Sequence, residues 1–114
     1  VETLDAIAIS ELGPKLEKDR FFPERANIGV AQLVGRNKVR LRVWERGAGL
    51  TLACGSGACA AGVAAARRGL TGRKVDIVME HGTLGIEWLR DDHVTMTGGI
   101  SLAYKGELDR SLLS

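Results

Sequence analysis

The sequence predicts an α+β domain in which a mainly antiparallel, barrel-like sheet wraps around one buried central helix. Two observations carry this prediction. Residues 57–66 contain no charged side chain and are nearly all alanine or glycine, so a helix here is expected to be buried around its whole circumference. Apolar and polar residues alternate on both sides of it, at 38–44 and 75–79, as in strands with one face in a core.

Length and composition fit a single globular domain over residues 1–114. The chain is 45% apolar and 26% charged, with a net charge of +2, so neither a nucleic acid nor a membrane is expected as a partner. We find no apolar run of bilayer length and no signal peptide, and expect a cytoplasmic location. Because the first residue is Val1, the chain is expected to begin inside a longer protein.

Before the central helix, the pattern predicts one irregular helix and two strands. Apolar residues recur at three- and four-residue spacing over 6–19, and Pro14 among them indicates a short or irregular helix. Residues 27–34 and 38–44 are expected to be strands. The turn at 35–37 would join them as a hairpin.

The central helix is predicted over 55–68, with Gly69 at its C-terminal cap. Its small side chains are expected to let the neighbouring backbone approach closely. The rest of the sheet is expected to come from strands at 75–79, 84–88, 94–97 and 100–104.

Cys54 stands where a strand-like segment meets the first turn of this helix. The first N–H groups of a helix lack internal partners and, with the helix dipole, favour negative charge. A cysteine here is expected to be favoured as a thiolate, and the N–H groups of Gly55, Ser56 and Gly57 are expected to seat a carboxylate. This pairing suits removal of a proton next to a carboxylate. Inversion of a stereocentre also needs an acid on the opposite face, which one cysteine cannot supply.

The second cysteine, Cys59, falls inside the predicted helix and is expected to be structural. The C-x4-C spacing is that of neither a redox motif nor a zinc pair, and a disulfide between the two would be strained. His81 and His93 are expected in a turn and on a surface strand, without partners at metal-ligand spacing. No metal site is predicted.

Three segments resemble the diaminopimelate epimerase family. The run 45–60, Glu-Arg-Gly-x-Gly-x-Thr-x-Ala-Cys-Gly-Ser-Gly-Ala-Cys-Ala, is similar to the second signature of the family. The segment 22–28 resembles its Phe-Pro-x-Arg-x-Asn motif. Residues 95–98, Tyr104 and 106–107 resemble its C-terminus, so the similarity covers essentially the whole chain.

The resemblance implies an enzyme of two similar domains, each a barrel-like sheet around a central helix, with the active site in the cleft between them. The chain would be the C-terminal half, and the N-terminal domain, with a partner cysteine, would be absent. The implied activity is isomerisation of LL- to meso-diaminopimelate in lysine biosynthesis, without a cofactor, with Cys54 as one of two acid/base cysteines. Its partners would be this substrate and the N-terminal domain, with a homodimer left open. The chain alone is expected to be inactive.

The same resemblance implies the roles of the remaining site residues. Gly55 and Ser56 would hold the reacting α-carboxylate, and Ser56 keeps the hydroxyl of the threonine more common in the family. Glu45 would assist at the reacting amino acid centre. Asn27 and Arg46 would bind the distal amino acid group, with Arg46 taking its carboxylate.

Three alternatives stay open at this level. Residues 55–60 formally match a dinucleotide-binding fingerprint, Gly-x-Gly-x-x-Ala, with Asp76 about twenty residues further on. However, Asp76 falls near the start of its strand, and the later strands read as antiparallel hairpins. A related cofactor-independent racemase of the same fold, acting on proline or hydroxyproline, is the second alternative. A non-catalytic interaction module on this fold is the third.

Overall fold

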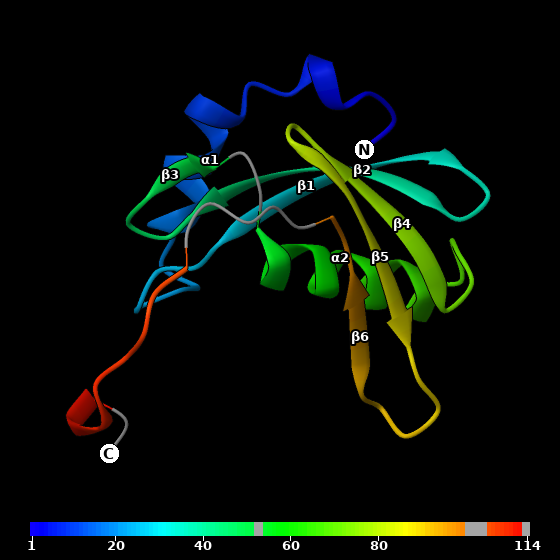
Figure 1. The fold of residues 1–114 in the computed structure, drawn as a ribbon. Helices are drawn as coiled ribbons and strands as arrows, with labels where there is room; N and C mark the ends of the chain where they lie inside the picture. Colours follow the sequence, from blue (N-terminus) through cyan, green and yellow to red (C-terminus); the bar gives the residue numbers. More distant parts are fainter. Residues whose placement is uncertain (52–53, 100–104, 113–114) are drawn as a thin grey trace.

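The computed structural model describes residues 1–51, 54–99 and 105–112. Over these residues the chain adopts an α+β fold, as predicted (Figure 1). The elements are, in order, η1 (Leu4–Ala6), α1 (Ile9–Glu17), β1 (Ile28–Gly35), β2 (Lys38–Glu45), β3 (Gly49–Thr51), α2 (Gly55–Arg67), β4 (Lys74–Met79), β5 (Gly82–Trp88), β6 (Val94–Thr97) and η2 (Arg110–Leu112). The strand expected at 100–104 lies outside the described residues.

Within the described residues, six strands form one sheet in the order β1-β2-β4-β5-β6, and β3 pairs with one end of β2. One edge of β2 serves two partners, because its residues 38–40 pair with β4 and its residues 43–45 pair with β3. The β2–β4 pairing is parallel, since the chain crosses over through α2 before it enters β4. The other pairings are antiparallel, which confirms the prediction of a mainly antiparallel sheet.

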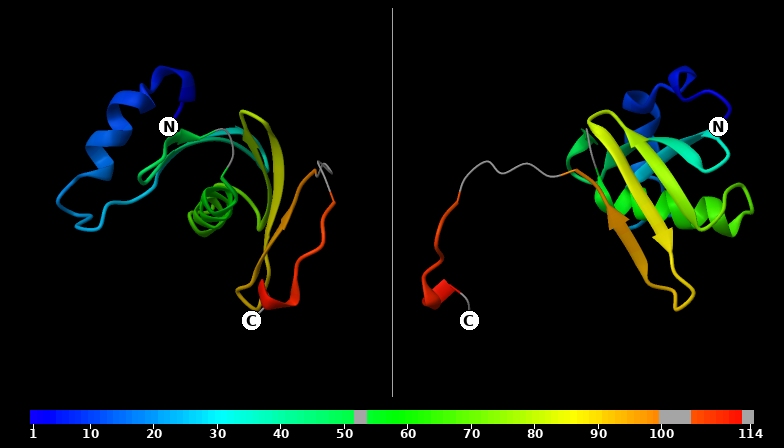
Figure 2. Two further views of the ribbon diagram at one scale, coloured as in Figure 1. Left: turned by 60° about the vertical axis from the view of Figure 1, so that its left-hand side comes forward. Right: turned by 45° about the vertical axis from the view of Figure 1, so that its right-hand side comes forward.

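The sheet is curved, and α2 lies on the inside of the curve, as the left view of Figure 2 shows. The inward side chains of β2, β4 and β5 form the main core with α2. The outer side of β1 and β2 is covered by η1 and α1 (Figure 1), where a smaller core contains Leu4, Ile9 and Val30. The alternation predicted for β2 is confirmed, because its apolar residues enter the main core. These main-core residues of β2 are Val39, Leu41 and Val43.

Glycine lets α2 approach the sheet closely. A Cβ on Gly62 would lie 2.8 Å from Cγ2 of Ile86, and a Cβ on Gly57 would lie 2.9 Å from Cγ2 of Val43. Both distances are well inside van der Waals contact. The helix ends as predicted, with Gly69 in the left-handed conformation at φ 73°.

Burial of α2 is one-sided in the described structure. Ala58 and Gly62 are buried against the sheet, whereas Ala60 and Ala64 are exposed. The sheet covers one side of the helix, and its edge strands β1 and β6 do not pair within the described residues (Figure 2). The predicted burial around the whole circumference, and the wrapping by a barrel-like sheet, are therefore not confirmed. The absence of charge along a helix permits burial on every side, but it does not determine how much of the helix surface the sheet covers.

Ion pairs fasten η1 to the outer face of β2. Arg40 donates from both terminal nitrogens to the Asp5 carboxylate, at 3.0 and 2.9 Å. Arg42 reaches the same carboxylate at 3.2 Å and Glu80 at 3.5 Å. The residues that alternate with the main-core side chains of β2 thus connect the sheet to the N-terminal segment.

Acidification should remove the contribution of Asp5 to stability. Hydrogen bonds from Arg40 and its charge hold the pKa of the Asp5 carboxyl below the usual value of 3.8. A carboxyl with a lowered folded-state pKa stabilises the fold above its ordinary pKa, and this is lost as the pH falls through the lowered value. We expect the difference in unfolding free energy between the original chain and Asp5→Asn to be constant above about pH 5 and to shrink on further acidification. Urea titrations at several pH values measure it, and a pH-independent difference would contradict the assignment.

Candidate active site

Cys54 is the N-cap residue of α2, with an extended backbone at φ −150° and ψ 103°. The Gly57 N–H donates to Sγ of Cys54 at 3.3 Å, and Oγ of Ser56 lies 3.5 Å from the same sulfur. The sulfur therefore takes the place of the oxygen in an ordinary N-cap side chain. The predicted position at the helix N-terminus is confirmed. The Gly57 N–H, which the sequence assigned to a carboxylate, is bonded to the sulfur instead.

The Cys54 side chain is part of the main core. The residue is only 7% exposed and packs with the core, whereas Ser56, two residues later, is exposed. The N–H groups of Gly55 and Ser56 belong to the first turn, where helix geometry provides no internal acceptor. An anion at this helix end would thus meet two donors beside a thiol, with little water around the sulfur.

Gly55 lies directly beneath β6 at the mouth of α2. A Cβ on Gly55 would lie 3.2 Å from the sulfur of Met96. A Cβ here would require the flexible Met96 side chain to shift slightly, so the backbone of Gly55 lies close to this residue of β6.

The other predicted site residues meet at the corner between β2 and β3. Oδ1 of Asn27 accepts from the backbone N–H of Arg46 at 2.7 Å. The guanidinium of Arg46 donates to the carbonyl of Glu24 at 3.1 Å. The hydroxyl of Thr51 donates to Oε1 of Glu45, also at 3.1 Å. The structure therefore brings Asn27, Glu45 and Arg46 together, and adds Glu24 and Thr51 as their anchors.

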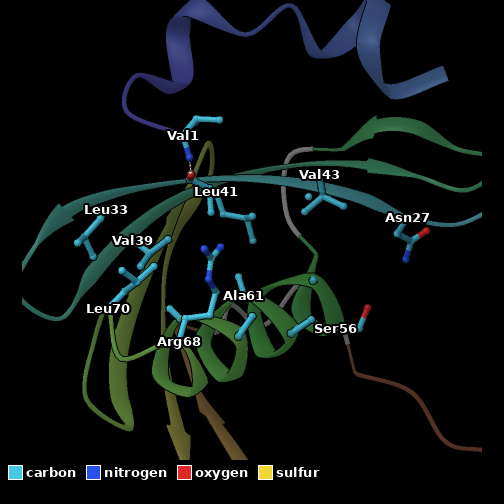
Figure 3. A pocket seen from close by; sticks show the side chains of 16 residues that line it. Val1, Asn27, Leu33, Val39, Leu41, Val43, Ser56, Ala61, Arg68 and Leu70 are labelled. Atoms are coloured by element: carbon cyan, nitrogen blue, oxygen red, sulfur yellow. Dashed lines mark hydrogen bonds between the residues drawn. The ribbon is translucent and has the colours of Figure 1, made fainter. Parts of the chain in front are cut away.

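A groove of about 610 Å³ runs between α2 and the strands β1 and β2. Figure 3 shows Asn27 on the sheet side and Ser56 on the helix side at the same end of this groove. The amide nitrogen of Asn27 points toward α2 in that view, and Arg68 lies toward the other end. Most of the remaining lining is apolar: Val1, Gly29, Ala31, Leu33, Val39, Leu41, Val43, Gly57, Ala60, Ala61, Ala64, Ala65 and Leu70.

The predicted residues thus form two groups, and each group contributes one residue, Asn27 or Ser56, to the same end of the groove. Over the ranges 1–51, 54–99 and 105–112, no hydrogen bond or ion pair joins Cys54 and Ser56 to Asn27, Glu45 or Arg46. A ligand with two charged ends is the kind of molecule that would bridge such groups.

Sequence reasoning missed Glu17 at the end of α1. This carboxylate is only 5% exposed, and its Oε1 accepts from Nε1 of Trp44 at 3.3 Å and from the N–H of Gly47 at 3.4 Å. The available signal was its place in the predicted irregular helix, one turn after Gly13. The apolar spacing used to find that helix contains no information about a buried acid.

The two cysteines and the two histidines lie within the described residues. Both cysteines are free, and Cys59 is half-buried against the main core, as expected for a structural residue. His81 and His93 are exposed. In the part of the chain that the structure describes, no three His, Cys, Asp or Glu side chains are grouped to hold a metal ion. No helix in that part has the length and apolar character needed to cross a membrane.

The dinucleotide alternative gains no support from the fold. Asp76 is the third residue of β4 and is exposed, so it lies near the start of its strand, as the sequence indicated. A nucleotide-binding acid in this fingerprint belongs to a run of parallel strands. In the described sheet only the β2–β4 pairing is parallel.

Fold and geometry define an α+β domain with a candidate acid/base thiol at a helix N-terminus. A family model for diaminopimelate epimerase matches residues 1–103. A protein named diaminopimelate epimerase from Acidiphilium cryptum is 56% identical over 114 residues, covering 100% of this chain and 41% of that protein. One from Rhodospirillum centenum is 54% identical over 113 residues, covering 99% of this chain and 39% of its own length. One from Gluconobacter oxydans is 59% identical over 102 residues, covering 90% of this chain and 40% of its own length.

The chain therefore belongs to the diaminopimelate epimerase family. It spans about 40% of the length of the curated relatives that it matches. The match extends across both groups of site residues, because the family model includes the segments that carry Asn27, Glu45, Arg46 and Cys54.

Proposed function

We propose that this chain is one half of a cytoplasmic, cofactor-independent epimerase that interconverts LL- and meso-diaminopimelate in lysine biosynthesis. In this proposal Cys54 is one of two cysteines that act as acid and base. The observation that carries it is the hydrogen bond from the Gly57 N–H to Sγ of Cys54 at 3.3 Å, at the mouth of α2, in a member of this family. This bond holds the sulfur at the N-terminus of α2, beside first-turn N–H groups that can bind a carboxylate.

The reaction inverts one α-carbon. A thiolate on one face takes the α-proton, the electron pair is delocalised into the carboxylate, and a thiol on the other face returns a proton. The N–H groups of Gly55 and Ser56 would bind the carboxylate where this negative charge grows. Cys54 serves one face, and the partner cysteine belongs to the N-terminal domain. In the reverse direction the two sulfurs exchange roles.

Asn27 and Arg46, at the corner between β2 and β3, would select the distal end of the substrate. The bond to the Glu24 carbonyl fixes one terminal nitrogen of Arg46. The other N–H donors of its guanidinium have no partner among the described residues and would bind a carboxylate. Asn27 turns its amide nitrogen toward the groove while its oxygen holds the Arg46 backbone (Figure 3). Glu45, held by Thr51, would act at the reacting amino acid centre. A substrate with amino acid groups at both ends satisfies all of these contacts.

The rest of a family-length protein would complete the architecture. Further strands would close the barrel-like sheet over the exposed side of α2, where Ala60 and Ala64 line the apolar groove. Burial of such a surface is favourable at about 25 cal/mol per Å² of apolar area. The N-terminal domain would then form a cleft with the polar end of the groove, where Asn27 and Ser56 lie. Below, the complete enzyme means a family-length protein that contains this chain, the further strands and the N-terminal domain.

The chain alone should not epimerise diaminopimelate. One cysteine reaches one face of the α-carbon, so inversion lacks its second proton carrier. Circular dichroism of LL-diaminopimelate incubated with the 114-residue chain, or with the complete enzyme, measures this directly. Activity of the chain equal to that of the complete enzyme would refute the division between two cysteines.

Replacement of the proposed catalytic sulfur should abolish most activity. We expect Cys54→Ala to lower kcat of the complete enzyme by about 10²- to 10⁴-fold, the usual range for loss of a general acid/base group. Cys59→Ala is the matched control on the same helix and should retain activity, because Cys59 packs against the core. Inversion and deuterium uptake from the solvent are followed together. Equal effects of the two substitutions would contradict the assignment.

Loss of the distal contact should weaken substrate binding more than chemistry. Arg46→Ala removes a charge-assisted hydrogen bond, and we expect KM for diaminopimelate to rise by about 10- to 100-fold. Arg36→Ala, at an exposed position in the β1–β2 turn, is the control and should leave KM unchanged. An unchanged KM in the Arg46 variant would mean that another group takes the distal carboxylate.

A further inference from the structure

The contacts of Glu17 point to a role in the candidate site. The carboxylate is buried, and one oxygen accepts two hydrogen bonds that link α1 to the corner between β2 and β3. One donor is the indole N–H of Trp44, and the other is the backbone N–H of Gly47. Burial of an acid is costly unless its oxygens are bonded, so these two donors are what keep Glu17 in place.

The indole of Trp44 is held on several sides. A Cβ on Gly13 would lie 2.5 Å from Cγ of Trp44, so α1 lies directly on the ring. Gly49 of β3 lies against the far part of the ring, where a Cβ would be 3.6 Å from Cη2. Gly13 and Glu17 are four residues apart and therefore share one face of α1. On this face of α1, Gly13 contacts the ring of Trp44 and Glu17 accepts the hydrogen bond from the ring N–H.

The second hydrogen bond links Glu17 to the corner between β2 and β3, where Arg46 lies. Gly47 has a left-handed backbone at φ 77° and directly follows Arg46. The N–H of Arg46 is bonded to Asn27, and the next N–H, that of Gly47, is bonded to Glu17. Two successive peptide units are therefore fixed by side chains from different parts of the chain. Together they set the direction in which the Arg46 side chain leaves the backbone.

We propose that Glu17 is a positioning residue for substrate recognition, which orients Arg46 toward the distal carboxylate by holding Gly47 and Trp44. The inference rests on the proposed function, because it gives Glu17 a purpose only if Arg46 binds substrate. Glu17 does not touch the substrate itself. Its effect passes through the backbone of the β2–β3 turn, so removal of its oxygen displaces Arg46 without removing any substrate contact.

The test compares two residues of the same length in the complete enzyme. Glu17→Gln keeps an accepting oxygen, and Glu17→Met fills the same space without one. We expect Glu17→Met to raise KM for diaminopimelate about tenfold with kcat within about threefold, and Glu17→Gln to stay within about twofold of the original KM. Hydrogen exchange of the 45–49 turn, followed by mass spectrometry, should be faster in Glu17→Met only.

Two controls separate positioning from general loosening. Asp5→Ala removes the carboxylate that attaches η1 to Arg40 of β2 and should leave KM unchanged. If Glu17→Met does not fold, Glu17→Asp replaces it, since that variant withdraws the carboxylate by one carbon–carbon bond and should show the same KM increase.

The outcomes also separate this inference from the proposed function. An inactive complete enzyme, or an Arg46→Ala variant with normal KM, would overturn the substrate role on which the inference rests. A raised KM in Arg46→Ala beside a normal KM in both Glu17→Met and Glu17→Asp would overturn the positioning role alone. A uniform loss of kcat across all Glu17 variants, with unchanged KM, would likewise refute it.

Discussion

Close packing of α2 against the inside of the curved sheet is the constraint on which the rest of the structure depends. Gly62 meets Ile86 and Gly57 meets Val43 at distances that leave no room for a Cβ. The same Gly57 gives its N–H to Sγ of Cys54. One glycine therefore brings the helix to the sheet and provides a donor for the thiol, so the core and the candidate site cannot be altered independently.

A second constraint acts on β2, which separates two cores. Val43 enters the main core, Trp44 faces α1 on the outer side, and Glu45 begins the corner that leads to Arg46. Because the side chains of a strand point to its two faces alternately, consecutive residues of β2 face α2 and α1 in turn. The corner between β2 and β3 lies at the end of β2, after the residues that face α2 and α1. Its geometry therefore depends on the outer layer, through Glu17, as well as on the central helix.

The groove combines two surfaces of different chemistry. Its length is lined by alanines and by inward residues of β1 and β2, which suit protein packing, while Asn27 and Ser56 give one end a polar character. Membership of a family whose curated relatives are about two and a half times as long agrees with this division. The apolar length suits packing against further protein, and the polar end suits a small ligand.

The sequence by itself determined the local features: the helix over 55–68, the Gly69 cap, the alternation in β2 and the place of Cys54 before a helix. Each depends on neighbours within a few residues, and residue type alone decides them. Only the tertiary structure decided the parallel β2–β4 pairing, the one-sided burial of α2, the engagement of the Gly57 N–H by sulfur and the contacts of Glu17. These depend on which distant segments meet, and neither hydrophobic period nor glycine spacing contains that information.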